Sequence, residues 1–274
     1  MNGLKAPRFS IITVNLNNRE GLRRTIESVA RQTLRDFELI VIDGGSNDGS
    51  TDVLRQHKED ITFWVSEPDS GIYNAMNKGI RLATGDYLNF MNSGDCFYDD
   101  GVLARVAGYH SEADIIVGRD YHYDQTTKRG HASVQPERLT MAHFFMATID
   151  HQSSFIRREL FSGNLYREDF RLVSDWIFFT EQIVCQGRQV DLIPDIVCRR
   201  EEGGLSEQQR NLNRQETDTY LRQLLPSGVY ADYVTLSKLD RITLYRLLDI
   251  CGNDRQRKLL TWCVKIIKRL FPSS

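Results

Sequence analysis

The chain has 274 residues, of which 41% are hydrophobic and 26% are charged, and its 35 basic and 37 acidic residues give a formal charge of −2. This composition is ordinary for a soluble globular protein, and the near-neutral charge argues against a nucleic-acid-binding protein. The length allows one large α/β domain or a core domain with a smaller appendage. Five widely spaced cysteines without a CxxC pair favour reduced thiols in a cytoplasmic protein. The first residues lack the apolar core of a signal peptide, and no apolar run approaches about 20 residues, so any membrane attachment is expected to be peripheral.

The first predicted elements form a strand–helix–strand unit. Residues 9–14 (FSIITV) predict a strand that is buried on both faces, and residues 37–43 (FELIVID) predict a second one. Between them, apolar residues on one face and arginines on the other predict a helix that packs on a sheet. This order within about 35 residues favours parallel strands joined by a right-handed crossover. The first strand and its loop fit nucleotide binding, which makes Thr13, Val14 and Asn15 candidate site residues.

The second predicted strand ends in a glycine-rich loop, DGGSNDGST, at residues 43–51. Glycine allows sharp bends and lets the backbone approach a ligand closely, so this loop is suited to binding a ligand. As a lone residue, Asp43 could equally be a turn former. The loop follows the second strand and lacks the GxGxxG spacing, which argues against a dinucleotide-binding dehydrogenase.

The next segment is predicted to contain a strand, a helix, a second strand and a polar turn. Residues 62–66 predict a strand, residues 71–82 a helix with one apolar stripe, and residues 86–91 (DYLNFM) a buried strand. That strand ends in NSGD, from Asn92 to Asp95. In open α/β sheets ligands bind at the carboxyl ends of the strands, so this turn is a candidate binding site.

These segments, in this order, resemble the nucleotide-sugar domain of family 2 glycosyltransferases, which are inverting enzymes of the GT-A type. The resemblance rests on EPDSGIYNAMNKG at residues 67–79, on the strand that follows, on NSGD, and on the loop at Asp43, which is similar to DxGSxDGT. It extends from residue 9 to residue 206, where GGLS is similar to the family's GGxS segment. The resemblance implies an α/β fold of the Rossmann-like GT-A kind, with a mostly parallel sheet flanked by helices and a helical C-terminal extension.

For the donor, the resemblance implies a nucleoside diphosphate sugar and a divalent metal ion, Mg²⁺ or Mn²⁺. Asp43 would accept a hydrogen bond from the base, but a carboxylate can accept from uracil, thymine or guanine alike, so UDP, dTDP and GDP stay open. Most relatives have further carboxylates in the acidic turn, whereas this chain has only Asp95, which can hold an ion if diphosphate oxygens and water complete its shell. The expected donor-binding residues are Thr13, Val14, Asn15, Asp43, Gly45, Asp69, Asn77, Lys78, Ser93, Arg199 and Arg200, and the expected metal ligand is Asp95.

For the acceptor, the segment RLVSDWIFF at residues 171–179 sets one carboxylate, Asp175, among aromatic and aliphatic residues. An aspartate is rarely buried without a partner or a function. Inverting transfer needs a base that takes the proton from the acceptor hydroxyl, and the resemblance aligns Asp175 with that base. Two alternatives stay open: Asp175 could cap the helix that follows, and Asp169 could be the base instead. His151 and Trp176 are expected on the acceptor side.

The expected organisation has four parts. They are an N-terminal tail (1–8), a nucleotide-sugar-binding subdomain (9–130), an acceptor-side subdomain (131–212) and a helical C-terminal extension (213–274). Residues 119–135 are polar and could form a hairpin or an ordered loop, in which His122 and His131 are expected to be solvated.

The last predicted helix, at residues 255–271, is basic and amphipathic. Its apolar residues, Trp262 among them, fall on one broad arc, and lysines and arginines fall on the other. Such a helix suits the surface of an anionic bilayer, and packing on the catalytic domain is the alternative.

The sequence therefore predicts a cytoplasmic inverting glycosyltransferase, associated peripherally with the cytoplasmic face of the inner membrane. A lipid-linked oligosaccharide acceptor in bacterial surface polysaccharide assembly is implied by the resemblance alone. Two other functions stay open. One is a non-catalytic nucleotide-sugar-binding scaffold subunit of a membrane assembly complex, and the other is a nucleotidyltransferase on a related fold.

Overall fold

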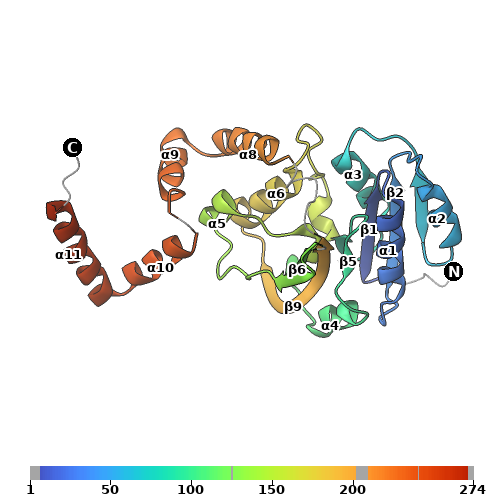
Figure 1. Cartoon of the computed structure of the whole chain (residues 1–274), viewed down its shortest axis with the longest axis horizontal. Helices are drawn as coiled ribbons and strands as arrows, with labels where there is room; N and C mark the ends of the chain where they lie inside the picture. The colour runs from blue at the N-terminus through green and yellow to red at the C-terminus, as the bar shows by residue number, and fades with distance from the viewer. Residues whose placement is uncertain (1–6, 125, 202–208, 240, 271–274) are drawn as a thin grey trace. The chain divides into compact units, whose positions relative to one another are not determined.

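The computed structural model describes residues 7–124, 126–201, 209–239 and 241–270 (Figure 1). By the contacts between its residues the chain divides into two units. The larger unit contains the chain up to Phe144 together with Thr148–Tyr220, and the smaller one contains Phe145–Ala147 together with the chain from Leu221 onward. All strands of the described residues belong to the larger unit.

The larger unit begins with four parallel strands. Its first elements are β1 (Phe9–Asn15), α1 (Arg19–Ala30), β2 (Phe37–Asp43), α2 (Ser50–Gln56), β3 (Phe63–Ser66), α3 (Ile72–Leu82) and β4 (Tyr87–Phe90). The strands lie in the order β3–β2–β1–β4, and all pairings among them are parallel. The strands predicted in this segment and the helix predicted at residues 71–82 are confirmed.

The second half of the sheet is mixed. Its elements are β5 (Cys96–Phe97), α4 (Val102–Gly108), β6 (Ile115–Asp124), β7 (Arg129–Ala132), α5 (Met141–Met146), η1 (His151–Ser153), β8 (Ser154–Arg157), η2 (Arg158–Phe161), α6 (Ser174–Phe179), the π-helical turn η3 (Thr180–Cys185) and β9 (Val190–Glu201). The sheet continues from β4 through β8, β6 and β9 to β5, and of these pairings only β6–β9 is parallel. The predicted α/β sheet flanked by helices is confirmed, but its parallel pairing dominates only in the first half.

The polar segment at residues 119–135 is largely a hairpin. β6 extends to Asp124, and β7 pairs with it in antiparallel fashion. The connection between these strands is short, and a short connection permits only antiparallel pairing. The boundary predicted between residues 130 and 131 falls inside β7, and both predicted subdomains contribute strands to the same sheet.

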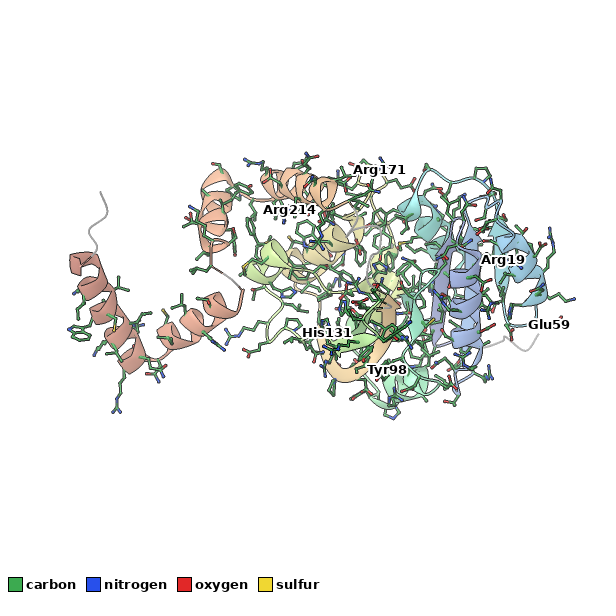
Figure 2. The ribbon with its side chains drawn as sticks, in the orientation of Figure 1. Arg19, Glu59, Tyr98, His131, Arg171 and Arg214 are labelled. Atoms are coloured by element: carbon green, nitrogen blue, oxygen red, sulfur yellow. The ribbon has the colours of Figure 1, made fainter. Side chains whose placement is uncertain are left out.

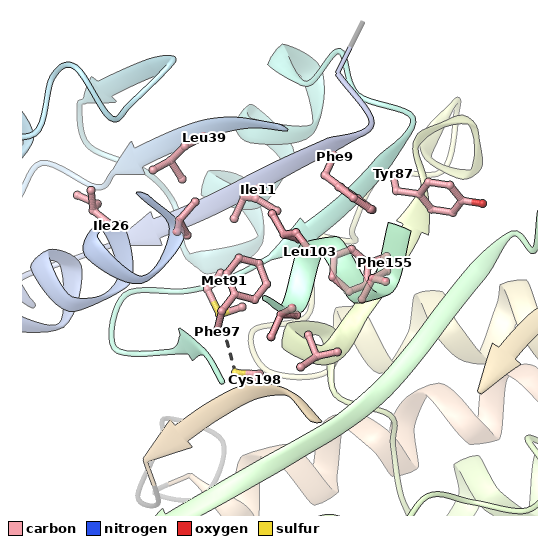
Figure 3. Close-up of a cluster of buried hydrophobic side chains, with 14 of the residues drawn as sticks. Phe9, Ile11, Ile26, Leu39, Tyr87, Met91, Phe97, Leu103, Phe155 and Cys198 are labelled. Carbon is pink, nitrogen blue, oxygen red and sulfur yellow. Dashed lines mark hydrogen bonds between the residues drawn. The ribbon is translucent and has the colours of Figure 1, made fainter. Parts of the chain in front are cut away.

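The main hydrophobic core lies between the sheet and helices that include α1 and α4 (Figure 3). Phe9 and Ile11 of β1 and Ile26 of α1 belong to this core. Successive strand residues point to opposite faces, so Ile12 faces the other side of the sheet, where α3 packs. A Cβ atom on Gly79 of α3 would lie 2.5 Å from Ile12 Cγ2, which shows how closely this helix approaches β1.

The smaller unit is helical. Its helices are α9 (Ser227–Leu236), α10 (Arg241–Gly252) and α11 (Asp254–Leu270), and α8 (Arg210–Leu224) leads into it. Phe145 stacks on Tyr233 with ring centroids 5.3 Å apart. Leu259 and Trp262 of α11 are each 60% exposed.

Candidate active site

Three neighbouring strands end in polar residues that contact one another. The register pairs Asn15 of β1 with Asp43 of β2, and Asp43 with Ser66 of β3. The Asp43 carboxylate accepts hydrogen bonds from Asn15 Nδ2 (2.6 Å), Ser66 Oγ (2.5 Å), Ser46 Oγ (2.6 Å) and Ser46 N (2.9 Å). Burial alone would raise the pKa of Asp43, but these hydrogen bonds outweigh burial and lower it. Asp43 is therefore an ionised anchor for the loop after β2.

The residues of β1 and β2 that are predicted to contact the nucleotide are buried or hydrogen-bonded within the protein. Asp43 is fully buried, so a base could reach its carboxylate only if one of its serine partners moved aside. Within the described part of the chain, Thr13 Oγ1 and Asn15 Oδ1 are buried without a hydrogen-bond partner. The carbonyl oxygen of Val14 accepts a hydrogen bond from Ser93 N at 3.1 Å and so joins β1 to the NSGD turn. Donor binding by these residues stays a prediction.

Two glycines make room for Asp69 and its neighbours. A Cβ atom on Gly44 would lie 2.5 Å from Asp69 Oδ2, closer than real Cβ contacts come. Gly45 has a φ of +81°, a conformation that residues with side chains rarely adopt. Asp69 Oδ1 also accepts a hydrogen bond from Gly71 N at 2.9 Å. Asp69 thus lies against the loop that carries Gly45, at the carboxyl edge of the parallel strands.

The two predicted donor residues on α3 have protein partners. Asn77 is 1% exposed, its Nδ2 donates to Tyr166 O (2.8 Å) and Glu168 Oε1 (2.9 Å), and its Oδ1 accepts from Tyr166 N (3.0 Å). This geometry favours a structural role for Asn77 over the predicted donor contact, because both of its amide hydrogens are already used. Lys78 Nζ pairs with Glu67 Oε1 at 2.7 Å, so its charge is balanced within the protein.

The NSGD turn is held against the first turns of α1. Thr25 Oγ1 donates to Asp95 O at 2.7 Å, and Asn18 Nδ2 donates to Ser93 O at 2.9 Å. The Asp95 carboxylate accepts a hydrogen bond from Gln152 Nε2 at 3.0 Å. Burial raises the pKa of Asp95, because the charged form loses solvation.

A divalent ion fits this turn only with help from other ligands. Asp95 supplies one carboxylate, and the neighbouring Asn92 and Gly94 supply none. Mg²⁺ and Mn²⁺ are commonly held by one or two carboxylates together with phosphate oxygens and water, so Asp95 is compatible with an ion that arrives with a diphosphate. The assignment of Asp95 as a metal ligand stays a prediction.

A second group of ionisable side chains is electrostatically coupled to the turn, and the sequence did not reveal it as a unit. Asp120 and His122 of β6 and Asp150 before η1 each offer one ligand atom, and these atoms lie within 4.8 Å of one another. Arg200 of β9 has its Nη1 3.5 Å from Asp150 Oδ1 and donates from Nε to His122 Nδ1 at 3.3 Å. Burial and the Asp150 carboxylate raise the pKa of Asp120 to about 10. Asp150 and Arg200 also act on the charge of Asp95.

The two histidines of the hairpin differ in their surroundings. His122 was expected to be solvated in a loop, and this expectation is wrong, because His122 is partly buried in β6 beside Arg200. His131, labelled in Figure 2, is exposed as predicted and stacks on the His122 ring with centroids 5.3 Å apart. The sequence signal was the alternation of Asp120 and His122, which places both on one face of a strand.

Asp175 lies in the first turn of α6 and is hydrogen-bonded through both carboxylate oxygens. Oδ1 accepts from Tyr73 Oη at 2.6 Å, and Oδ2 lies 2.7 Å from His151 Nδ1. His151 Nε2 in turn lies 3.1 Å from Asn92 Nδ2 of the NSGD turn. Burial would raise the pKa of Asp175, but the hydrogen bond and charge of His151 and the Tyr73 hydroxyl lower it. Burial would lower the pKa of His151, but its contact with Asp175 raises it.

The structure gives less support to the two alternatives, a helix-cap role for Asp175 and Asp169 as the base. The N-cap residue of α6 is Val173, so the interpretation of Asp175 as a helix cap is wrong. Asp169, the rival base, is exposed and pairs with Arg167 at 2.6 Å, which lowers the pKa of Asp169. Asp169 therefore has the surroundings of a surface ion pair, whereas the side chain of Asp175 is only 18% exposed.

The remaining predicted site residues lie in different surroundings. Trp176 is 6% exposed and donates from Nε1 to Phe144 O at 2.9 Å, which favours a core position over the predicted acceptor contact. The Arg199 guanidinium lies over the Tyr123 ring, 4.1 Å from its centroid. The GGxS segment at residues 203–206 lies outside the described residues.

Comparison with known sequences adds to this geometry. The chain matches the family described as Glycosyl transferase family 2 over residues 10–165. It is 37% identical over 183 residues to a PGL/p-HBAD biosynthesis glycosyltransferase of Mycobacterium tuberculosis, a match that covers 64% of this chain and 69% of that protein. It is 36% identical over 126 residues to the validoxylamine A glucosyltransferase of Streptomyces hygroscopicus, covering 43% of this chain and 30% of that protein.

Solved structures with a similar fold include two complexes with nucleotide sugars. S. aureus TarS 1–349 in complex with UDP-GlcNAc aligns with a TM-score of 0.60 at 15% identity, over 72% of this chain and 59% of that chain. The mannosyltransferase PcManGT from Pyrobaculum calidifontis, in complex with GDP-Man and Mn²⁺, aligns with a TM-score of 0.57 at 16% identity, over 98% of this chain and 88% of that chain. The fold is that of the GT-A glycosyltransferases. The chain belongs to glycosyl transferase family 2.

Proposed function

We propose that the chain transfers one sugar from a nucleoside diphosphate sugar to an acceptor hydroxyl with inversion of the anomeric centre, and that Asp175 is the base. The observation that carries the proposal is a mostly buried carboxylate whose pKa is lowered by His151 and Tyr73, although burial alone would raise it. An ionised carboxylate with few contacts to water is suited to accept the acceptor proton during attack. Its two partners hold it in one orientation.

On the donor side, we assign the nucleotide to the carboxyl ends of β1, β2 and β3 and the diphosphate to the vicinity of the NSGD turn. Asp95 would hold the divalent ion, which when bound supplies positive charge to the departing diphosphate. Ser93, Lys78, Arg199 and Arg200 are proposed to contact the donor as well. Glycosyltransferases of the same fold in complex with UDP-GlcNAc and with GDP-Man support a nucleotide sugar but leave the nucleotide open.

For the acceptor, we propose a lipid-linked glycan met at the cytoplasmic face of an anionic membrane. α11 supports this because Leu259 and Trp262 are largely exposed and the basic Lys258 and Lys265 share the helix with them. An exposed apolar stripe with basic residues binds anionic bilayer surfaces. None of the helices in the described ranges has the length and hydropathy needed to cross a bilayer.

The decisive experiment compares Asp175→Asn with Asp169→Asn. Nucleoside diphosphate release is measured with a panel of UDP-, dTDP- and GDP-sugars, with and without lipid extract as acceptor, and donor binding is measured by calorimetry. Asp175→Asn keeps the shape of the side chain but cannot take the proton, so transfer should fall by about 10² to 10⁴ while donor binding survives. Asp169→Asn, which alters only an exposed ion pair, should retain the wild-type rate.

The same assay separates the other functions. A wild-type rate in Asp175→Asn together with a loss of activity in Asp169→Asn would show that Asp169, and not Asp175, is the base. Release of pyrophosphate in place of nucleoside diphosphate would indicate a nucleotidyltransferase. Donor binding by the wild-type protein without any release, whatever the acceptor, would indicate a scaffold subunit.

A further inference from the structure

The group formed by Asp120, His122 and Asp150 has the geometry of a small cation site. Asp120 and His122 are two residues apart in β6, so both side chains lie on one face of the sheet. The parallel register pairs His122 with Arg200 of β9, and Asp150 approaches from the segment before η1. One oxygen or nitrogen atom of each of the three residues lies within 4.8 Å of the other two. Three ligand atoms this close can be drawn onto one ion by small side-chain movements.

An independent observation at Asp120 points to a ligand. Asp120 is 1% exposed, and its Oδ1 is buried without a hydrogen-bond partner in the described structure. Burial beside the Asp150 carboxylate raises the pKa of Asp120 to about 10, so Asp120 carries a proton when no cation is bound. A cation bound between these two side chains would take the place of that proton. The neighbouring Asp95 differs, since its carboxylate accepts a hydrogen bond from Gln152 and belongs to the NSGD turn.

Arg200 brings the positive charge to this group in the ion-free protein. Its contacts with Asp150 Oδ1 (3.5 Å) and His122 Nδ1 (3.3 Å) are both longer than a charge-assisted hydrogen bond usually is. A divalent ion carries twice the charge and binds such ligands at about 2.0–2.2 Å, so it can compete with the arginine for the same atoms.

We propose that Asp120, His122 and Asp150 bind one divalent transition-metal ion and that Arg200 competes with this ion for His122 and Asp150. One imidazole nitrogen and two carboxylates suit ions such as Mn²⁺, Co²⁺ or Zn²⁺ better than Mg²⁺ or Ca²⁺, which prefer oxygen ligands throughout. The site is distinct from the proposed ligand Asp95 in the NSGD turn. It does not require that the chain transfer a sugar, because the ion is bound by protein groups alone.

The test uses the full chain and Mn²⁺ alone, without nucleotide. Free Mn²⁺ is followed by electron paramagnetic resonance during titration of the wild-type protein and of Asp120→Asn and Asp150→Asn. Each variant removes one anionic ligand at constant shape, so Mn²⁺ affinity should fall by about tenfold or more. The matched control is Asp124→Asn, on the same strand, whose carboxylate accepts hydrogen bonds from the backbone of Thr126 and Thr127 and lies outside the group. Asp124→Asn and Asp95→Asn should both bind Mn²⁺ as the wild type does.

Arg200→Met is expected to change the affinity for Mn²⁺ in the opposite direction. Removal of a competing cation should raise the affinity for Mn²⁺, whereas a purely structural arginine would leave it unchanged or lower it. Circular dichroism and urea unfolding without metal show which variants are folded, and His122→Gln replaces Asp120→Asn if the latter is not.

Three results would overturn the proposal. The first is a wild-type protein that binds no Mn²⁺. The second is unchanged affinity in both Asp120→Asn and Asp150→Asn. The third is a loss confined to Asp95→Asn, which would place the ion in the NSGD turn.

Discussion

At the scale of single residues, the contacts around Asp175 decide what its carboxylate can do. Tyr73 and His151 bind one oxygen each, so the charge is stabilised where burial would otherwise neutralise it. Because its pKa in the folded protein is lowered, Asp175 contributes stability above the pKa of the unfolded chain, and this contribution is lost as pH falls through the folded value. The same shift would keep the proposed base ionised well into the acidic range.

Replacement of His151 tests this electrostatic support. In His151→Asn the hydrogen bond and the positive charge beside Asp175 are lost while burial remains, so the pKa of Asp175 should rise. The acidic limb of the pH–rate profile, measured between about pH 4 and pH 8, should then move to higher pH than in the wild type. His57→Asn, which alters a histidine paired with Asp60 in another part of the chain, should leave the profile unchanged. An unmoved acidic limb in His151→Asn would show that His151 does not support the base.

At the scale of elements, the close packing of α3 on β1 fixes the strand ends that carry the proposed donor site. Gly79 allows this approach, because any side chain would meet Ile12. The segment after η2 is joined to the same helix through Asn77, which binds both backbone polar groups of Tyr166. α3 thus connects the donor edge of the sheet to the segment that leads into α6.

Gly79→Ala is predicted to destabilise the larger unit. The added methyl group would overlap Ile12 Cγ2, and overpacking of this kind costs about 1–3 kcal/mol, partly offset by about 1 kcal/mol of better helix propensity. Gly108→Ala is the matched control, because nothing lies within 4 Å of the position its Cβ atom would take at the end of α4. Urea unfolding should show a lower free energy of unfolding only for Gly79→Ala. Equal stabilities would mean that β1 and α3 adjust to the methyl group without cost.

Local patterns predicted the elements of the first half of the sheet, because apolar periodicity marks buried strands and amphipathic helices directly. The second half of β6 has no such apolar pattern, because its residues are polar and include Asp120 and His122. The burial of Trp176 and Asn77 was also missed. Their partners, Phe144 and Tyr166, lie far away in the sequence, and spacing along the chain says nothing about such contacts.

At the scale of the whole molecule, the chain combines a sheet-containing unit with a helical one. Within the helical unit, α11 leaves Leu259, Trp262 and Val264 exposed by 60%, 60% and 42%. Neighbouring exposed apolar side chains on a helix commonly mark a surface that binds a partner or a membrane. The proposed membrane association would give these side chains such a surface.

Vesicle binding tests this association. The chain truncated after Gly252, and the double variant Leu259→Ser with Trp262→Ser, should both lose affinity for anionic vesicles, because each removes apolar area from α11. Wild-type binding should weaken as salt increases, since part of it is electrostatic. Val134→Ser, which removes another exposed apolar side chain, should bind as the wild type does. Equal binding by wild-type and truncated protein would assign the association to another part of the chain.

The contacts of the proposed base join distant parts of the chain, and this separation affects the order in which the parts of the site can form. Asp175 meets Tyr73, 102 positions earlier in the chain, and His151, 24 positions earlier. The strand ends that surround Asp43 are complete by residue 66. Closing a long loop costs more entropy than closing a short one, so the nucleotide edge can form before the base is assembled. A chain synthesised from its N-terminus would therefore complete the strand ends around Asp43 before it could assemble the contacts of the base.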